Sequence, residues 1–357
     1  MNRSRLLLAM LAFSLWLCPA AAQTPPGSLP SDLVGADPLS EDQEQRVEAY
    51  AEAWGGRLLE GDDQQVADAR KRLLGPLQAA NASPAFRDEL SLNLFDVMRD
   101  ALASERVIVR LNAVMVLAEL SGTTAAQLMG TALGDSSPAV RYWAAQGIEP
   151  LAATLEQGPR ARNALGLLHQ RVKAAAETEP LPVVFGPLLN NLAKIGLPEA
   201  VMDALRLMNQ RVDVHAKDPT RNLANEVRTL KEIFQRVQVQ DNVPEGDEPY
   251  RWIALVCYRY LRLSAEVLAM DWYDDPNSAV RSSYIEMARE ADERLRFAVS
   301  KRLASEAELP PQINALIGAG QWNMIRDQVN TAWVLQLTRD PIGFSPQQLT
   351  VTVLPPE

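Results

Sequence analysis

The segment Asp135-Ser-Ser-Pro-Ala-Val-Arg141 decides the fold, because its pattern recurs in the chain. It returns as Asp275-Pro-Asn-Ser-Ala-Val-Arg281, and a weaker copy, Ser104-Glu-Arg-Val-Ile-Val-Arg110, precedes the first. Pro138 falls where a helix would begin, a position at which no backbone N–H is needed. A turn-plus-helix signal that recurs indicates a stack of helical hairpins.

The weaker copy and the copy at Asp135 also share an apolar face. When Arg110 is aligned with Arg141, apolar or small residues coincide at three- and four-residue spacing, which is typical of helices that bury one side. The coinciding positions are Val109 with Val140, Ala113 with Ala144, and Leu117 with Ile148.

The entry at Asp135, together with the Tyr-Trp-Ala-Ala-Gln-Gly-Ile148 that follows Arg141, resembles a HEAT repeat of the short type. In that family the aspartate of the turn and the arginine of the second helix form a hydrogen-bonded ladder between neighbouring repeats. The resemblance implies an all-α fold, a solenoid of HEAT-like helical hairpins with a less regular helical C-terminal half. It assigns structural ladder roles to Asp135, Arg141, Asp275 and Arg281, and a partial role to Arg110, whose own turn lacks the aspartate.

Changes in composition divide the chain into segments. Residues 241–249 combine acids with two prolines and a glycine, a pattern typical of a linker. Residues 349–353 alternate like a strand, so the tail either packs in extended form or is free. We expect a signal peptide at 1–22, a flexible linker at 23–39, HEAT-like repeats at 40–240, an acidic linker at 241–249, a helical region at 250–340 and an extended tail at 341–357.

The N-terminus has the pattern of an export signal. Arg3 and Arg5 precede an apolar stretch, Leu6 to Leu17, and Ala20-Ala-Ala22 offers a cleavage site of small residues. We expect cleavage before Gln23 and export to the periplasm or cell envelope. The stretch is too short to span a bilayer as a helix, so we expect no transmembrane span in the mature chain. An uncleaved or lipidated anchor and a buried helix of a cytosolic protein are the alternatives.

Charge and motifs exclude several functions. Lys and Arg number 35 against 45 Asp and Glu, a net charge of −10, whereas a nucleic-acid binder needs a basic stripe. No hydrolase, protease or P-loop motif is present, so we assign no catalytic, cofactor-binding or metal-ligating residue. His169 and His215 have no second ligand at metal spacing, and we expect both at the surface or at helix ends. Cys257 lies in an apolar run and should be buried.

Aromatic residues concentrate between positions 250 and 284, beside Asp271 and Asp274. This pattern fits the boundary of a helical core, and it also fits a cleft that binds a glycan or a cation. Catalytic carboxylates in the same segment are a third interpretation. The residues predicted for a binding surface are Trp252, Tyr258, Tyr260, Trp272 and Tyr273.

A stack of helical hairpins exposes a long surface and usually acts by holding partners. We therefore expect an exported, non-enzymatic scaffold or adaptor that binds one or more protein partners, without nucleic acid. The alternative is an envelope enzyme, or a protein that binds a glycan or small ligand through residues 250–284.

Overall fold

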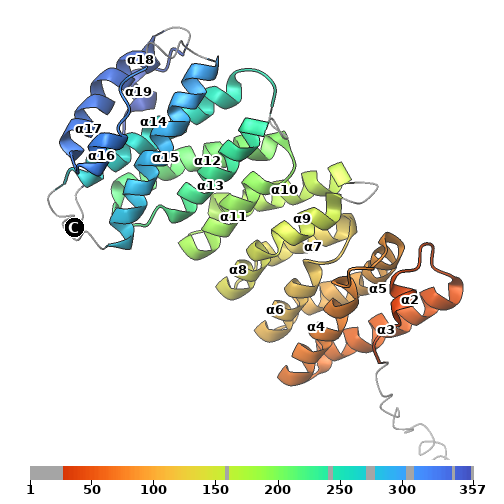
Figure 1. Ribbon diagram of the computed structural model, residues 1–357. Coiled ribbons are helices and arrows are strands. Elements are labelled where there is room, and N and C mark those ends of the chain that lie inside the picture. The colour runs from red at the N-terminus through yellow and green to blue at the C-terminus, as the bar shows by residue number, and fades with distance from the viewer. Residues whose placement is uncertain are drawn as a thin grey trace, which may run out of the picture. The chain divides into compact units, whose positions relative to one another are not determined.

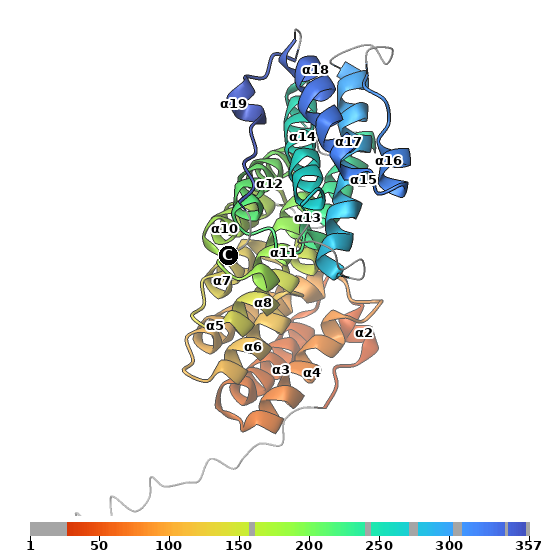
Figure 2. The same ribbon diagram turned by 90° about the vertical axis from the view of Figure 1, so that its left-hand side faces the viewer.

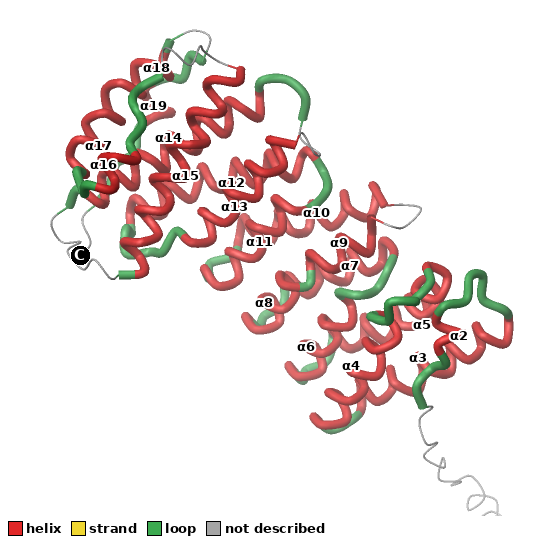
Figure 3. Tube along the Cα trace, in the orientation of Figure 1, coloured by secondary structure: helices red, strands yellow, loops and turns green. Residues whose placement is uncertain are grey.

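The structure is a computed structural model that describes residues 27–156, 161–239, 244–270, 278–302, 309–339 and 342–354. Within these ranges the secondary structure is helical and no residue forms a strand (Figure 1 and Figure 3), which confirms the predicted all-α class. The chain divides into two compact units, Met1–Val97 and Met98–Glu357, and the division falls inside helix α5.

The described part of the first unit begins with three helices, and α5 starts in this unit and ends in the second. The bounds are α2 Ser31–Val34, α3 Glu41–Glu60, α4 Asp63–Leu77 and α5 Pro84–Leu102.

The second unit contains the remaining helices, ending with several short ones. Their bounds are α6 Val107–Leu117, α7 Gly122–Leu133, α8 Pro138–Gln146, α9 Ile148–Glu156, α10 Ala161–Thr178, α11 Pro182–Lys194, α12 Pro198–Lys217, α13 Ala224–Val239, α14 Glu248–Leu268, α15 Ala279–Arg302, α16 Asn314–Gly318, α17 Trp322–Gln328, the π-helix η2 Val329–Trp333, α18 Val334–Thr338 and α19 Pro346–Leu349.

Residues 27–39 are packed against the first unit. Leu33 and Val34 are buried, and the backbone N–H of Ser83 donates to the carbonyl of Val34 at 3.0 Å. The side chain of Asn81 donates to the carbonyl of Ser31 at 2.8 Å. The prediction of a flexible linker is therefore wrong for this stretch, because two apolar side chains among its polar and proline residues hold it in the core. Residues 1–26, with the predicted signal peptide, lie outside the described part.

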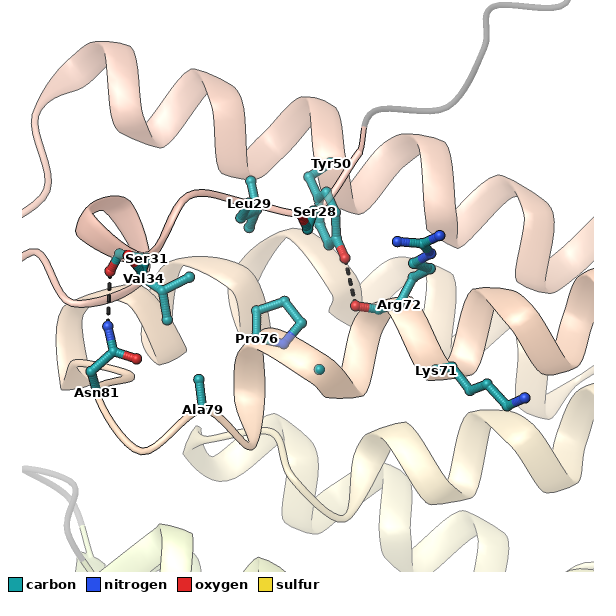
Figure 4. Close-up of a pocket in the computed structure, with 11 residues that line it drawn as sticks. Ser28, Leu29, Ser31, Val34, Tyr50, Lys71, Arg72, Pro76, Ala79 and Asn81 are labelled. Carbon is teal, nitrogen blue, oxygen red and sulfur yellow. Dashed lines mark hydrogen bonds between the residues drawn. The ribbon is translucent and has the colours of Figure 1, made fainter.

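Helix α4 depends on a side chain from α3. Pro76 lies inside α4 and has no N–H to donate to the carbonyl of Arg72, four residues earlier. The buried Tyr50 supplies the missing donor, because its hydroxyl donates to that carbonyl at 2.5 Å (Figure 4). Burial raises the pKa of Tyr50 to about 12, so the hydroxyl keeps its proton at neutral pH. Tyr50 thus completes the hydrogen bonding of a helix that proline interrupts.

We expect Tyr50→Phe to lower the free energy of unfolding of the first unit by about 1–2 kcal/mol, because it leaves the Arg72 carbonyl without its donor. Urea unfolding of the full chain measures this loss. In a Pro76→Ala background the alanine N–H can donate to the same carbonyl. There, Tyr50→Phe should lower the free energy of unfolding by less than half as much as it does in the wild-type background. An equal loss of unfolding free energy in the two backgrounds would show that the Tyr50 hydroxyl has another role.

The helices of the second unit form two layers. Layer A contains α7, α10, α12 and α14, each in contact with the next, and layer B contains α6, α8, α11, α13 and α15, which also contact one another in order (Figure 1 and Figure 2). Apart from the short α9, successive helices alternate between the layers, so each hairpin contributes one helix to each. This arrangement is the predicted solenoid of helical hairpins.

The C-terminal half is less regular, as predicted. The long helices α14 and α15 pack against each other, and short helices with the π-helix η2 follow them. The tail packs rather than projects: Leu349 and Val351 are buried, and the N–H of Leu354 donates to the carbonyl of Ala216 at 2.8 Å. Residues 349–353 do not form the strand that their alternation suggests, and the predicted linker at 241–249 is described only from residue 244 onward.

Candidate functional site

The turn before α8 is held by an arginine from α6. Arg110 Nε donates to Asp135 Oδ2 at 2.8 Å and Nη2 donates to Oδ1 at 3.2 Å, a two-point contact between neighbouring hairpins. The remaining nitrogen, Nη1, donates to the carbonyl of Ser104 at 2.7 Å in the turn before α6. Both charged side chains are largely buried, with 11% and 9% of their surfaces exposed. Arg110 therefore joins its own turn to the next one.

Arg141 repeats this arrangement one hairpin later. Its Nε donates to Glu179 Oε2 at 2.7 Å and Nη2 donates to Oε1 at 3.1 Å, while Nη1 donates to the carbonyl of Asp135 at 2.9 Å. Burial raises the pKa of Glu179, but the hydrogen bonds from Arg141 and from the backbone N–H of Leu181 outweigh burial and hold that pKa below its usual range. Glu179 is thus a ladder residue, and sequence reasoning missed it.

The turns before the layer-B helices share a second feature, which also identifies Glu179 as the turn residue before α11. In each, a side-chain oxygen accepts the backbone N–H two residues later, which fixes the chain where a layer-B helix begins. Pro182 follows Glu179 at the same distance as Pro138 follows Asp135, and this spacing was the available signal in the sequence. The pairs are Ser104 with Arg106 at 3.2 Å, Asp135 with Ser137 at 2.7 Å, Glu179 with Leu181 at 3.0 Å and Asn222 with Ala224 at 2.7 Å.

The ladder changes at α11. Phe185 occupies the position, three residues after Pro182, that Arg141 occupies after Pro138, and Arg211 from α12 places its guanidinium 4.4 Å from the centre of the Phe185 ring. Asp275 lies outside the described residues, so its predicted contact is not described. The predicted partner Arg281 places its guanidinium 5.9 Å from the Trp322 ring.

Both histidines are buried, so the predicted surface position is wrong, although His215 lies in the last turn of α12, as the helix-end alternative predicts. His169 Nε2 lies 3.0 Å from Asp203 Oδ2, and His215 Nε2 lies 2.9 Å from Glu226 Oε1. Each carboxylate comes from a helix that contacts the histidine's own helix, α12 against α10 and α13 against α12, and gives the Nε2 atom of the buried ring a hydrogen-bond partner. The local sequence around each histidine does not reveal these partners.

Layer B carries an exposed row of large apolar side chains. Val107 on α6 is 40% exposed, Trp143 on α8 is 43% exposed and Val183 on α11 is 62% exposed. The rings of Tyr142 and Trp143 meet edge to face with centroids 5.9 Å apart. The three helices are consecutive in the layer. We call these side chains, with their half-buried neighbours, the apolar strip: Val107, Leu111, Met115, Tyr142, Trp143 and Val183.

A cavity of about 310 Å³ lies between α9, α11 and α13. Gly147 separates α8 from α9, and a Cβ on it would lie 3.0 Å from the Cβ of Ala118, so the helix break packs closely on the core. Apolar Ile148, Ala152 and Ile195 form part of the lining. We call the cavity the wedge, and its polar lining residues are Glu149, Asn191, Lys194, Glu232, Gln235 and Arg236.

The charges of the wedge are balanced. Lys194 Nζ lies 2.8 Å from Glu149 Oε2, and Arg236 Nε lies 3.3 Å from Glu232 Oε1. A second nitrogen of Arg236 donates to the carbonyl of Lys194 at 2.6 Å, at the end of α11. Asn191 donates to the carbonyl of Ala145 at 2.7 Å, which ties α11 to α8. Two cations and two carboxylates give the wedge no net formal charge.

The predicted aromatic binding surface is largely core. Tyr258 and Tyr260 are fully buried, and Tyr260 donates its hydroxyl to the carbonyl of Met208 at 3.1 Å, so the core interpretation is right for these two residues and the binding-surface interpretation is wrong. They lie on α14, which packs against both α12 and α15. Trp252 is half-buried, with the Arg206 guanidinium 5.8 Å from its ring, and Trp272 and Tyr273 lie outside the described residues.

Cys257, on the same helix, is buried as predicted, and burial raises the pKa of its thiol to about 12. Across the described residues, His, Cys, Asp and Glu side chains do not gather in groups of three or more that could hold a metal ion. The described helices include none with the length and apolar character to cross a membrane.

Comparison with known proteins gives a structural likeness alone. No family model matches the chain, and no curated protein matches it. The crystal structure of Kap121p matches with a TM-score of 0.41 and 14% sequence identity over 87% of this chain. A mutant of Kap121p gives the same values. The match covers 35% of Kap121p, so the chain spans about a third of the length of the protein it matches.

Proposed function

We propose that the chain is a HEAT-like scaffold that binds a protein partner through the apolar strip on layer B of the second unit. The exposed Trp143, flanked on adjacent helices by Val107 and Val183, carries this proposal. Contiguous exposed apolar side chains mark interaction surfaces, and tryptophan is among the residues that contribute most to binding energy at interfaces.

The packing beneath the strip supports this role. Arg141 precedes Tyr142 and Trp143 directly, and its bonds to Glu179 and to the carbonyl of Asp135 fix the start of α8. The aromatic pair therefore stands on a rigid element, which lowers the entropy that binding costs. No enzymatic step is part of the proposal.

Affinity capture with matched variants tests this function. Tagged wild type, Trp143→Ala and Met324→Ala would be incubated with extract from the native cells, and Met324 serves as a control because it is 55% exposed on a different helix of the same unit. We expect a stoichiometric protein partner with wild type and with Met324→Ala, and at least a tenfold reduction with Trp143→Ala at unchanged melting temperature. A partner that Trp143→Ala retains fully would refute the role of the strip.

Export is proposed separately, on the basis of Arg3, Arg5 and the apolar stretch that follows them. Intact-mass measurement of the protein from its native cells tests it. Cleavage before Gln23 supports export, and a mass that retains the whole segment before Gln23 without a lipid contradicts the predicted processing.

A further inference from the structure

The first unit contains a cavity of about 310 Å³ between α2, α3 and α4 (Figure 4). This volume is at the lower end of the range of about 300–1,000 Å³ that is typical of small-molecule sites. Gly75 forms part of the wall, and a Cβ added there would meet no described atom within 4 Å, so the space beside it is open. The cavity lies in the first unit, whereas the apolar strip lies in the second, so its ligand need not be the partner of the strip.

The middle of the cavity is apolar. Leu29 and Val34 line it together with Pro76 and Ala79, from the end of α4 and the turn that follows. Val34 is buried, but the other three side chains are half-buried and leave apolar surface that a ligand can cover. Removing apolar surface from water is favourable in proportion to the area covered. The middle of the cavity therefore favours a hydrocarbon group.

One end of the cavity is cationic. In Figure 4 Lys71 and Arg72 lie at this end of the lining, and Ala79 and Asn81 lie at the other. Both cationic side chains are exposed, and neither forms an ion pair with a residue that the structure describes. The described residues that line the cavity include no aspartate or glutamate. The wedge pairs its cations with carboxylates of its own lining, whereas this cavity leaves its cations available to an anion from solution.

The positive charge extends beyond the lining. The guanidinium of Arg72 lies 5.5 Å from the centre of the Trp54 ring, and that of Arg57 lies 5.4 Å from the same ring. Arg57 also has no ion pair within the described part of the chain. Burial raises the pKa of Tyr50 to about 12, and of the two charges near its hydroxyl, Arg72 lowers that pKa more than Asp68 raises it. The electrostatic potential at this end of the cavity is therefore positive.

We propose that the cavity binds a small amphipathic anion, a carboxylate that carries a short hydrocarbon chain. The carboxylate lies at the cationic end, where the guanidinium of Arg72 donates two parallel hydrogen bonds to it and Lys71 adds a second positive charge. The hydrocarbon chain follows the apolar middle toward Ala79. An inorganic anion would leave the apolar middle uncovered, and a neutral or cationic amphiphile would leave the cations unpaired.

Isothermal titration calorimetry of the full chain with octanoate tests this inference. We expect saturable binding of one molecule per chain, at least tenfold tighter than that of butanoate, because each additional methylene covers more apolar surface. 1-Octanol and octylammonium have the same chain without the negative charge, and each should bind at least tenfold more weakly than octanoate. Absence of saturable octanoate binding would overturn the inference, and so would equal affinities for octanoate and 1-octanol.

Substitutions test the position of the ligand. Arg72→Gln should weaken octanoate binding at least tenfold, and Lys71→Gln at least threefold, because each removes a positive charge from the cationic end. Arg46→Gln is the matched control, because Arg46 is exposed on α3 and does not line the cavity. Its replacement should change the dissociation constant less than twofold. Equal effects of Arg72→Gln and Arg46→Gln would show that overall charge alone attracts octanoate, which refutes the site.

Leu29→Ala tests the apolar middle. It removes part of the apolar lining and should weaken octanoate binding at least threefold at unchanged melting temperature. An unchanged affinity would show that the hydrocarbon chain lies elsewhere and would refute the proposed orientation.

Trp143→Ala separates this inference from the proposed function. It should leave the octanoate affinity unchanged, because Trp143 lies in the second unit. Octanoate binding that disappears with Trp143→Ala would place the ligand on the apolar strip and overturn the inference. The capture of a protein partner does not depend on the octanoate result, so either proposal can fail while the other stands.

Discussion

Replacing Arg141 with alanine is expected to lower the free energy of unfolding of the second unit by about 3 kcal/mol. The substitution removes two hydrogen bonds to Glu179 and leaves that carboxylate without its countercharge where 3% of its side-chain surface is exposed. It also removes the bonds to the carbonyls of Asp135 and Ser136, at 2.9 and 3.3 Å. Removing one partner of a buried ion pair lowers the free energy of unfolding by more than the intact pair contributes to it, because the remaining charge stays desolvated.

Urea unfolding followed by circular dichroism measures this loss. Arg289→Ala is the matched control, because Arg289 is exposed on α15. Its replacement should change the free energy of unfolding by at most about 0.5 kcal/mol, as is usual for surface sites. Equal destabilisation by Arg141→Ala and Arg289→Ala would contradict the ladder.

The same pair gives a pH dependence with a definite sign. The pKa of Glu179 is lower in the folded chain than the value of about 4.3 in unfolded chains. The ion pair therefore contributes fully above the unfolded pKa, and its contribution disappears as the pH falls through the lower folded value. The stability difference between wild type and Arg141→Ala should accordingly shrink on acidification below about pH 4.3.

Replacing Asp203 with alanine is expected to cost a similar amount, about 3 kcal/mol. Asp203 Oδ2 lies 3.0 Å from His169 Nε2, and Oδ1 accepts from Lys173 at 3.2 Å and from Arg206 at 3.0 Å. Burial raises the pKa of Asp203, but the bonds from Lys173, Arg206 and His169 outweigh burial and hold that pKa below its usual range. Without the carboxylate, the buried ring of His169 loses its partner and Lys173 loses its countercharge, while Arg206 keeps Glu248 at 3.8 Å.

A double variant distinguishes an ion-pair effect from a packing effect. His169→Leu combined with Asp203→Leu removes both polar groups and fills the space, so it should be closer in stability to wild type than Asp203→Ala is. Urea unfolding of the three proteins provides the comparison. If the double variant is the least stable of the three proteins, the contact between His169 and Asp203 contributes more stability than burying the two polar groups costs. The expected order of stabilities would then be wrong.

The fold could be predicted because its signal is local. The entry at Asp135 combines a turn, a proline at the first helical position and an apolar face within a short stretch, and each feature favours the same structure. The position of Glu179 could not be predicted by a fixed period, because the interval from Asp135 to Glu179 is longer than the interval from Ser104 to Asp135. Each hairpin fixes its own turn, so the loops and helices between turns are free to differ in length.

The candidate site was harder to predict, because exposure depends on neighbours that are distant in sequence. Tyr258 and Trp143 both lie on helices rich in apolar residues, yet Tyr258 is covered by neighbouring helices and Trp143 is not. His169 was misplaced for the same reason, since its partner Asp203 is 34 residues away on another helix. The sequence shows which side chains are apolar or ionisable, and only packing shows which of them meet.

The bond from Tyr50 to the carbonyl of Arg72 has an evolutionary consequence. The hydroxyl is useful only while Pro76 denies that carbonyl its helical donor, so residues 50 and 76 form one inherited unit although they lie on different helices. A lineage that lost the proline would release position 50 from selection for a hydroxyl. A lineage that lost the tyrosine first would carry an unsatisfied carbonyl until the proline was replaced, so the order of the two changes is constrained.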